Sequence, residues 1–145
     1  MKNSLVIDDH CFACGKNNPL GLKLHIRQVA TEMDKKLVQK AVCSFTLKKE
    51  YQGYGGIIHG GILATILDEL MIYSLYYHEI PTVTAKMEIK FRAKIIAGES
   101  MEASAWMVHD RGKMVEATGE IRNAKGKVVV TAQGLLAKVK EVVRK

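Results

Sequence analysis

The longest apolar stretch of the chain, residues 59–78, predicts one buried helix. Nearly every position in it is hydrophobic or small, and only Asp68 and Glu69 interrupt it with negative charge. Because apolar side chains occur on almost all sides of such a helix, we expect it to lie at the centre of the domain, covered by other elements. Pro81 closes the connection that follows.

A strict alternation of apolar and polar residues predicts the clearest strand, over residues 84–95. Its odd positions are apolar and its even positions are charged from Lys86 onward, which is typical of a sheet with one buried and one solvated face. Similar patterns predict strands over residues 22–29, 37–47, 100–109, 114–122 and 127–139. One helix followed by an antiparallel meander indicates an α+β domain in which the sheet wraps around the helix.

The remaining segments predict loops. We expect a loop or short helical turn over residues 1–20, a polar turn over 31–36 and a glycine-rich loop over 51–56. The lysine-rich end, residues 138–145, predicts a frayed strand. Since the 145 residues contain no repeat or low-complexity segment, they are expected to form one domain.

Composition narrows the class of protein. A hydrophobic content of 48% indicates a globular chain, and no apolar run is long enough to cross a bilayer. The N-terminus has no signal-peptide core, and three cysteines cannot all pair with one another, so we expect a cytoplasmic protein. The net charge of +7 suits nucleic acid or a polyanionic small molecule such as a coenzyme A ester.

The helix entrance predicts a site for an oxygen that gains negative charge. His59, Gly60 and Gly61 open the helix. Glycines let another group approach the free N–H donors of the first turn, and the helix dipole favours an anion there. A carboxylate inside the apolar helix is costly unless it is paired or used. An oxyanion site with a general base or nucleophile indicates acyl-group chemistry.

The order of elements and several motifs resemble the hotdog-fold thioesterases, in particular the phenylacetate-degradation-type acyl-CoA thioesterases. The matching motifs are residues 51–61, Asp68 nine residues after His59, and residues 83–85. Residues 11–15 and 18–22 are also similar to the start of one branch of that family. The resemblance implies a hotdog fold, hydrolysis of an acyl-CoA thioester by a homodimer or dimer of dimers, and no required metal or redox cofactor.

The resemblance also implies roles for particular residues. In the family, the helix aspartate activates water or attacks the thioester, and a glycine N–H polarises the thioester carbonyl. These positions correspond to Asp68 and to Gly60, with help from Gly61. His59 and Thr84 match the supporting residues of the family.

One position departs from the family pattern. Many relatives carry Asn or Gln seven residues before the donor glycine, and this position is Gly53 here. The neighbouring Gln52 is the candidate to take over the positioning of substrate. Without such a side chain, a module that binds acyl-CoA but does not cleave it stays an alternative.

The spacing within the helix predicts a shared site. Gly60 and Asp68 are eight residues apart, or about 12 Å along a helix, so one carbonyl cannot touch both in a single chain. A two-fold dimer with two shared active sites solves this problem. Glu69 competes with Asp68 for the catalytic role, but neighbouring helix residues point about 100° apart. The resemblance to the thioesterase motif spacing favours Asp68, and we assign Glu69 to an interface ion pair or to the border of the acyl pocket.

The basic residues indicate where coenzyme phosphates could bind. Most of the charged stripe along residues 86–94 is expected to be a solvated face, with Arg92 and Arg111 as candidates for phosphate contacts. Because the stripe lacks interleaved aromatic residues, nucleic acid is disfavoured. A group of aromatic residues near the helix end predicts core or dimer packing or an acyl tunnel, namely Tyr73, Tyr76 and Tyr77.

The pair Cys11 and Cys14 raises the question of a metal site. Zinc needs four ligands, and His10 and His25 are the nearby candidates, but no second cysteine pair follows and Cys43 lies in a predicted strand. We therefore expect no metal. A dehydratase is also disfavoured, because no motif in the chain pairs a histidine with a carboxylate over an acyl chain.

Overall fold

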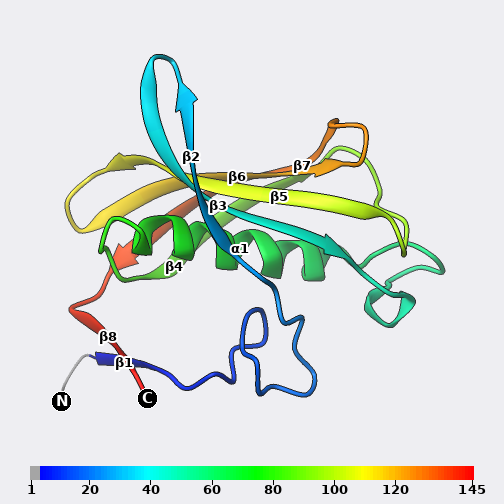
Figure 1. Cartoon of the computed structure of the whole chain (residues 1–145), viewed down its shortest axis with the longest axis horizontal. Coiled ribbons are helices and arrows are strands. Elements are labelled where there is room, and N and C mark those ends of the chain that lie inside the picture. Colours follow the sequence, from blue (N-terminus) through cyan, green and yellow to red (C-terminus); the bar gives the residue numbers. More distant parts are fainter. Residues whose placement is uncertain (1–3) are drawn as a thin grey trace.

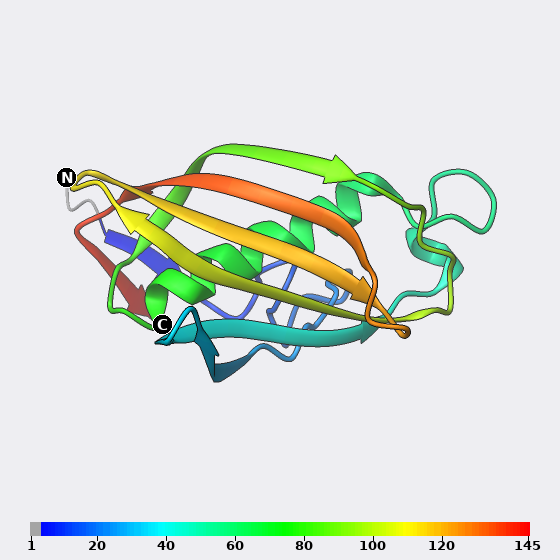
Figure 2. The same cartoon turned by 90° about the horizontal axis from the view of Figure 1, so that it is seen from above.

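In the computed structural model, which describes residues 4–145, a six-stranded antiparallel sheet curves around one long helix, α1 (Gly60–Tyr76) (Figure 1). Figure 2 shows the strands running over the helix. The order across the sheet is β2 (Arg27–Met33), β3 (Lys36–Thr46), β5 (Ser100–Asp110), β6 (Met114–Asn123), β7 (Val128–Lys138) and β4 (Thr82–Phe91). A 3₁₀ turn, η1 (Lys49–Tyr51), precedes the loop that leads into α1. The predicted α+β class and central helix are confirmed.

Small residues in the middle of the sheet let α1 pack closely against it. A Cβ atom added at Gly119 would lie 3.1 Å from Cδ2 of Leu67, and one added at Gly134 would lie 2.9 Å from Sδ of Met71. Larger residues there would push the helix away, so these glycines fix how deeply α1 lies in the sheet. The fully buried large residues of α1 are Ile66, Leu67, Leu70, Met71 and Leu75.

The ends of α1 are set by its capping residues. The helix begins one residue later and ends two residues earlier than predicted, because His59 is its N-cap and Tyr77 its C-cap. Beyond it, Glu79 adopts a left-handed backbone with φ 59°, which turns the chain toward β4. Within residues 4–145, no helix has both the length and the hydropathy that a bilayer crossing requires.

Strand β4 forms an edge of the sheet, whereas the sequence pattern predicts it as the first strand of a meander. Only β5, β6 and β7 form that meander, and β4 pairs with β7. The reason lies in residues 92–99, which pass the helix entrance, where the Ile58 N–H donates to the Ile95 carbonyl at 2.9 Å. This connection carries the chain past β7 and β6 before β5 begins.

The alternation predicted along β4 is only partly confirmed. Met87 and Ile89 are half-buried, and the charged residues between and beside them are exposed. A β-bulge between Thr84 and Lys86 interrupts the register with β7 and leaves Ala85 exposed. Because β4 has no neighbouring strand on its outer side among residues 4–145, its row of backbone groups there is available to a partner.

The first hairpin begins later than predicted. The first part of the strand expected over residues 22–29 is tied instead to the N-terminal loop, because Leu22 and Leu24 donate to carbonyls of that loop at 2.8 and 2.9 Å. The six-residue turn predicted after it is also wrong. Asp34 and Lys35 alone form the turn, with φ of 49° and 63°, as a two-residue hairpin turn requires.

The two ends of the described chain form a small parallel sheet of their own. β1 (Ser4–Ile7) pairs with β8 (Glu141–Arg144), so the expected N-terminal loop and frayed C-terminal end are wrong for these residues. Their pairing joins segments from opposite ends of the sequence, which no local pattern indicates. Residues 1–3 of the predicted loop lie outside the described residues. Figure 1 shows the segment between β1 and β2 on the side of α1 away from the sheet.

Candidate active site along the sheet edge

The entrance of α1 presents one free backbone donor. Nδ1 of His59 accepts a hydrogen bond from the Gly61 N–H at 2.9 Å, so this donor is already used. The Gly60 N–H takes part in no hydrogen bond among residues 4–145. Because it also lies at the positive end of the helix dipole, it can receive an oxygen that carries negative charge. For the Gly61 N–H to act as a second donor, as predicted, its hydrogen bond to His59 would have to break.

Gly60 opens onto a shallow depression next to the end of β4. A Cβ atom added at Gly60 would lie 3.3 Å from Cζ of Phe91, whose ring therefore forms one wall beside the glycine. The depression measures about 410 Å³, and Arg92 and Lys94 also line it. The approach to Gly60 thus runs over a surface that carries two cations. The role of Arg92 as a phosphate contact stays a prediction.

Asp68 lies two turns further along α1 and faces β4. The Thr84 hydroxyl donates a short hydrogen bond to its Oδ1 atom, and the contact is half-buried. Within the described chain, no Lys, Arg or His forms an ion pair with Asp68. The carboxylate is therefore fixed by a neutral donor and keeps an oxygen for another proton. The supporting residue Thr84 thus contacts Asp68, while the roles of both residues stay predictions.

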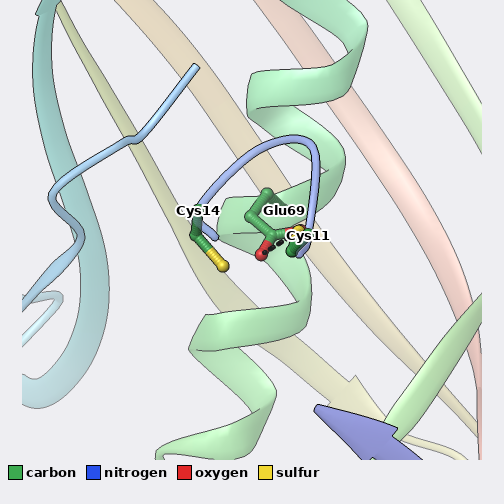
Figure 3. Close-up of side chains that lie close together, drawn as sticks. All are labelled: Cys11, Cys14 and Glu69. Carbon is green, nitrogen blue, oxygen red and sulfur yellow. Dashed lines mark hydrogen bonds between the residues drawn. The ribbon is translucent and has the colours of Figure 1, made fainter. Parts of the chain in front are cut away.

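Glu69 points away from Asp68, toward the N-terminal loop. Figure 3 shows its carboxylate between Cys11 and Cys14, and the Cys11 thiol donates to Oε1 at 3.5 Å. The Tyr73 hydroxyl donates to Sγ of Cys14 at 3.3 Å. The ion pairs found within residues 4–145 do not include Glu69. An ion pair of Glu69 across an interface would involve a second chain and stays a prediction.

The surroundings of Cys14 change its acidity. Burial, together with a hydrogen bond to the Glu69 carboxylate, raises the pKa of the Cys14 thiol to about 12. Burial also raises the pKa of Tyr73. Both groups are consequently protonated at neutral pH in the metal-free protein, so neither is an activated nucleophile.

A cavity of about 460 Å³ begins beside Glu69. Its wall is largely apolar and includes Ile72, Tyr76 and Val83, and the cysteine pair also lines it. Thr82 contributes to the same wall with only 5% of its surface exposed, and its hydroxyl has no hydrogen-bond partner within the described residues. A buried polar atom without a partner is costly, which favours an occupant that can form a hydrogen bond there.

Two predicted substrate-binding residues are engaged elsewhere in this chain. Oε1 of Gln52 accepts from the Gly56 N–H at 2.8 Å and so holds the glycine-rich loop together. Arg111 pairs with Glu116 at 2.8 Å, next to the turn between β5 and β6 at the far end of the sheet from Arg92. A single chain therefore does not bring the two arginines together.

Sequence reasoning missed three features of this region. The wall that Phe91 forms beside Gly60 depends on β4 being an edge strand, and the partnerless hydroxyl of Thr82 depends on how the cavity is closed. The contact of Glu69 with Cys11 joins residues 58 positions apart. The only sign of these features in the local sequence is the row of apolar residues on the inner face of β4. This row indicates that the face is buried, but it does not indicate a role in the site.

One family of known proteins matches the sequence of this chain. The sequence model of the thioesterase superfamily matches residues 55–130. Among curated proteins, no sequence matches the chain. The solved structure of a thioesterase superfamily protein is similar at 22% identity with a TM-score of 0.75, covering 89% of this chain and 60% of that protein. The chain thus spans three fifths of the length of that relative.

Two further structures are similar over most of their length. The PaaI protein from the phenylacetic acid degradation operon of E. coli has 20% identity and a TM-score of 0.69, covering 81% of this chain and 82% of its own. A hypothetical thioesterase from Streptococcus pneumoniae, solved with coenzyme A, has 17% identity and a TM-score of 0.66, covering 79% and 95%. The helix, the antiparallel sheet and the matched half of the sequence together establish that this chain is a hotdog-fold member of the thioesterase superfamily.

Proposed function

We propose that the protein hydrolyses an acyl-CoA thioester to a free acid and coenzyme A, in an active site shared between two copies of the chain. One observation carries this proposal. The free N–H of Gly60 and the pair formed by Asp68 and Thr84 lie on the same side of α1, and both lie next to the open edge of β4. The first supplies an oxyanion donor and the second a held carboxylate, which are the two groups that thioester hydrolysis needs.

Pairing of two β4 edges would complete the site. An antiparallel arrangement with Met87 on the two-fold axis puts Lys86 opposite Glu88 of the partner subunit, a favourable cross-strand pair. Since Thr84 and Ala85 share one position at the bulge, the same register puts Phe91 opposite Thr82 of the partner subunit. The charge pairing supports this register.

The same pairing supports a shared site. Phe91 packs on Gly60, and Thr82, which lies opposite Phe91 in this register, is two residues before Thr84 in the chain. Gly60 of one subunit therefore comes near Thr84 and Asp68 of the other. The separation of about 12 Å between Gly60 and Asp68 along one helix is then bridged by a second chain.

The proposed reaction follows from these positions. The thioester carbonyl oxygen accepts from the Gly60 N–H, which stabilises the negative charge that develops on it. Asp68 of the partner subunit takes a proton from water as the water oxygen bonds to the carbonyl carbon, or bonds to that carbon itself. The C–S bond then breaks, and the coenzyme A thiolate leaves and takes up a proton. On the route in which Asp68 itself bonds to the carbon, water then hydrolyses the acyl–aspartate anhydride and releases the free acid and the Asp68 carboxylate. Thr84 is a positioning residue that holds the Asp68 carboxylate.

The surroundings of the site support an acyl-CoA substrate. The cavity of about 460 Å³ beside Glu69 has the size and apolar lining of a small-molecule pocket, and we assign the acyl group to it. Arg92, in the depression beside Gly60, is the candidate for a phosphate contact, and Arg111 stays a weaker one because Glu116 already pairs with it. The relative solved with coenzyme A supports the coenzyme half of the substrate.

A module that binds acyl-CoA without cleaving it is the second candidate. Gly53 has no side chain to position substrate, and Gln52 is bound within its own loop. These two observations favour binding without turnover. The alternative predicts saturable binding of acyl-CoA with no release of free thiol.

Release of free thiol from a panel of short, medium, long and aryl acyl-CoAs tests the proposal. We expect release from at least one class, and its loss when Asp68 is replaced by Asn. Binding of the esters without release from any of them would refute hydrolysis and establish the binding module. Release that persists in Asp68→Asn would refute the assignment of the base.

A further inference from the structure

The loop that carries Cys11 and Cys14 is built with little freedom. A Cβ atom added at Gly15 would lie 2.5 Å from both the Asp9 carbonyl oxygen and the Cys11 nitrogen, so no side chain fits there. The Gly15 N–H donates to the Cys11 carbonyl at 2.9 Å. This geometry fixes the backbone that carries the two sulfur atoms.

The second half of the motif closes the loop from the other side. The Asn18 side chain donates to the His10 carbonyl at 3.1 Å and accepts from the Leu20 N–H at 2.9 Å. Gly21 is equally constrained, because an added Cβ would lie 2.9 Å from the Phe12 carbonyl oxygen. Contacts within the loop itself thus hold the cysteines in place, which is the preorganisation that a ligand-binding loop needs.

The two sulfur atoms and the Glu69 carboxylate form a compact group. One ligand atom from each of the three residues lies within 4.8 Å of the others (Figure 3). Zn–S bonds of about 2.3 Å and Zn–O bonds of about 2.0 Å at a tetrahedral angle put sulfur and oxygen about 3.5 Å apart. The distance between Sγ of Cys11 and Oε1 of Glu69 is 3.5 Å. One edge of the group therefore matches a tetrahedral zinc site, and the other ligand atoms lie within 4.8 Å of both of its ends.

We propose that Cys11, Cys14 and Glu69 bind one Zn²⁺ ion, with the fourth coordination position open to the cavity beside them. Two thiolates and one carboxylate are ligands that zinc accepts. Binding displaces the two thiol protons to solvent, so the ion and its three ligands carry a net charge of −1. The cation also supplies the partner that Glu69 lacks within residues 4–145, where no Lys, Arg or His pairs with it.

The sequence analysis expects no metal, because it finds too few ligands near the cysteine pair. The fold adds Glu69, which the sequence alone does not associate with the two cysteines. His10 and His25, the candidates near the pair, are not part of the group of ligand atoms. Cys43 is fully buried in β3, away from the other two cysteines. The inference does not rest on the proposed hydrolysis, since metal binding is measured without substrate.

Titration of the reduced full-length protein with Zn²⁺, in competition with a chromophoric chelator, tests the proposal. We expect one ion per chain, at least about a hundredfold weaker binding in Cys11→Ser and Cys14→Ser, and at least about tenfold weaker binding in Glu69→Gln. Cys43→Ala is the matched control, because it removes a cysteine outside the group and is expected to keep the affinity of the unmodified protein.

Co²⁺ provides a second readout that does not depend on whether a serine variant folds. The unmodified protein should show sulfur-to-cobalt charge-transfer absorption and the strong visible bands of tetrahedral cobalt, with the visible bands altered in Glu69→Gln. The proposal would be overturned if the unmodified protein bound zinc no more tightly than the Cys11→Ser/Cys14→Ser double variant. Unchanged binding in Glu69→Gln, or a Cys11–Cys14 disulfide whose reduction restores no metal uptake, would overturn it as well.

Discussion

Asp68 and Glu69 are neighbours in α1, yet their carboxylates meet different parts of the chain. Asp68 faces β4 and accepts from Thr84, while Glu69 faces the N-terminal loop and accepts from Cys11. Successive helix residues point about 100° apart, so one turn of α1 directs a carboxylate toward β4 and another toward the N-terminal loop. The sheet edge offers a neutral hydroxyl and an open strand, and the loop offers two soft sulfur ligands. The same chemical group is thus suited to proton transfer in one region and to metal binding in the other.

Replacing Asp68 by Asn should give the largest difference between the two regions. Loss of the general base is expected to lower kcat by about a hundredfold or more, while zinc affinity stays that of the unmodified protein. Glu69→Gln should show the reverse pattern, with weaker zinc binding and a loss of kcat at least about tenfold smaller. Steady-state thiol release and the zinc titration measure both. Equal losses of kcat in the two variants would contradict the separation.

Replacing Gly60 by Pro removes the proposed oxyanion donor and leaves the helix start intact. Proline suits the first helical position, and His59 before it has φ −62° and ψ 130°, which is compatible with a following proline. We expect kcat to fall by about a hundredfold. Gly60→Ala is the matched control, because it adds a Cβ against Phe91 but keeps the N–H. If the alanine variant loses as much as the proline variant, steric fit and not the donor is responsible.

Thr84→Val should have an intermediate effect. It removes the hydroxyl that donates to Asp68, and a hydrogen bond to a charged group is worth about 1.5–3 kcal/mol. We expect kcat to fall by about tenfold with KM nearly unchanged, because Thr84 orients the carboxylate and does not bind substrate. Thr84→Ser should restore most of the rate. A change in KM alone, or no recovery with serine, would assign Thr84 another role.

Glu88→Lys should have the smallest effect and tests the register of the proposed dimer. It replaces two opposite-charge cross-strand pairs by two like-charge pairs. The two lost attractions together are worth about 0.4–2 kcal/mol, so the dimer should dissociate at least about twofold more readily. Adding Lys86→Glu should restore the affinity. Sedimentation over a concentration series measures both, and a double variant as weak as the single one would place another residue opposite Glu88.

The helix entrance could be predicted from the sequence because its interactions are local. His59 caps a donor only two residues away, and the apolar run that follows defines α1 directly. The pair of Asp68 and Thr84, 16 residues apart, was reached only through the spacing of the thioesterase motifs. The helical spacing of apolar residues predicts which face of a helix is buried, but it does not predict which strand a given residue will face.

Other features depend on tertiary pairing that no local pattern records. The position of β4 at the sheet edge follows from the path of residues 92–99 around the helix entrance. The contact of Glu69 with Cys11 arises because the N-terminal loop folds onto the side of α1 away from the sheet (Figure 1). The sequence marks Cys11 and Cys14 as a pair, but the third member of the group lies 55 residues beyond Cys14.

Coexpression of Gly60→Pro and Asp68→Asn subunits tests the central claim, a site shared between two chains, most directly. Each variant alone should be nearly inactive. In a random mixture, half of the dimers contain one subunit of each kind. Each of these mixed dimers has one site that carries both substitutions and one site that carries neither. About a quarter of the activity of the unmodified protein should therefore return. A mixture as inactive as the separate variants would contradict the shared site, because a site within one chain is defective in every subunit.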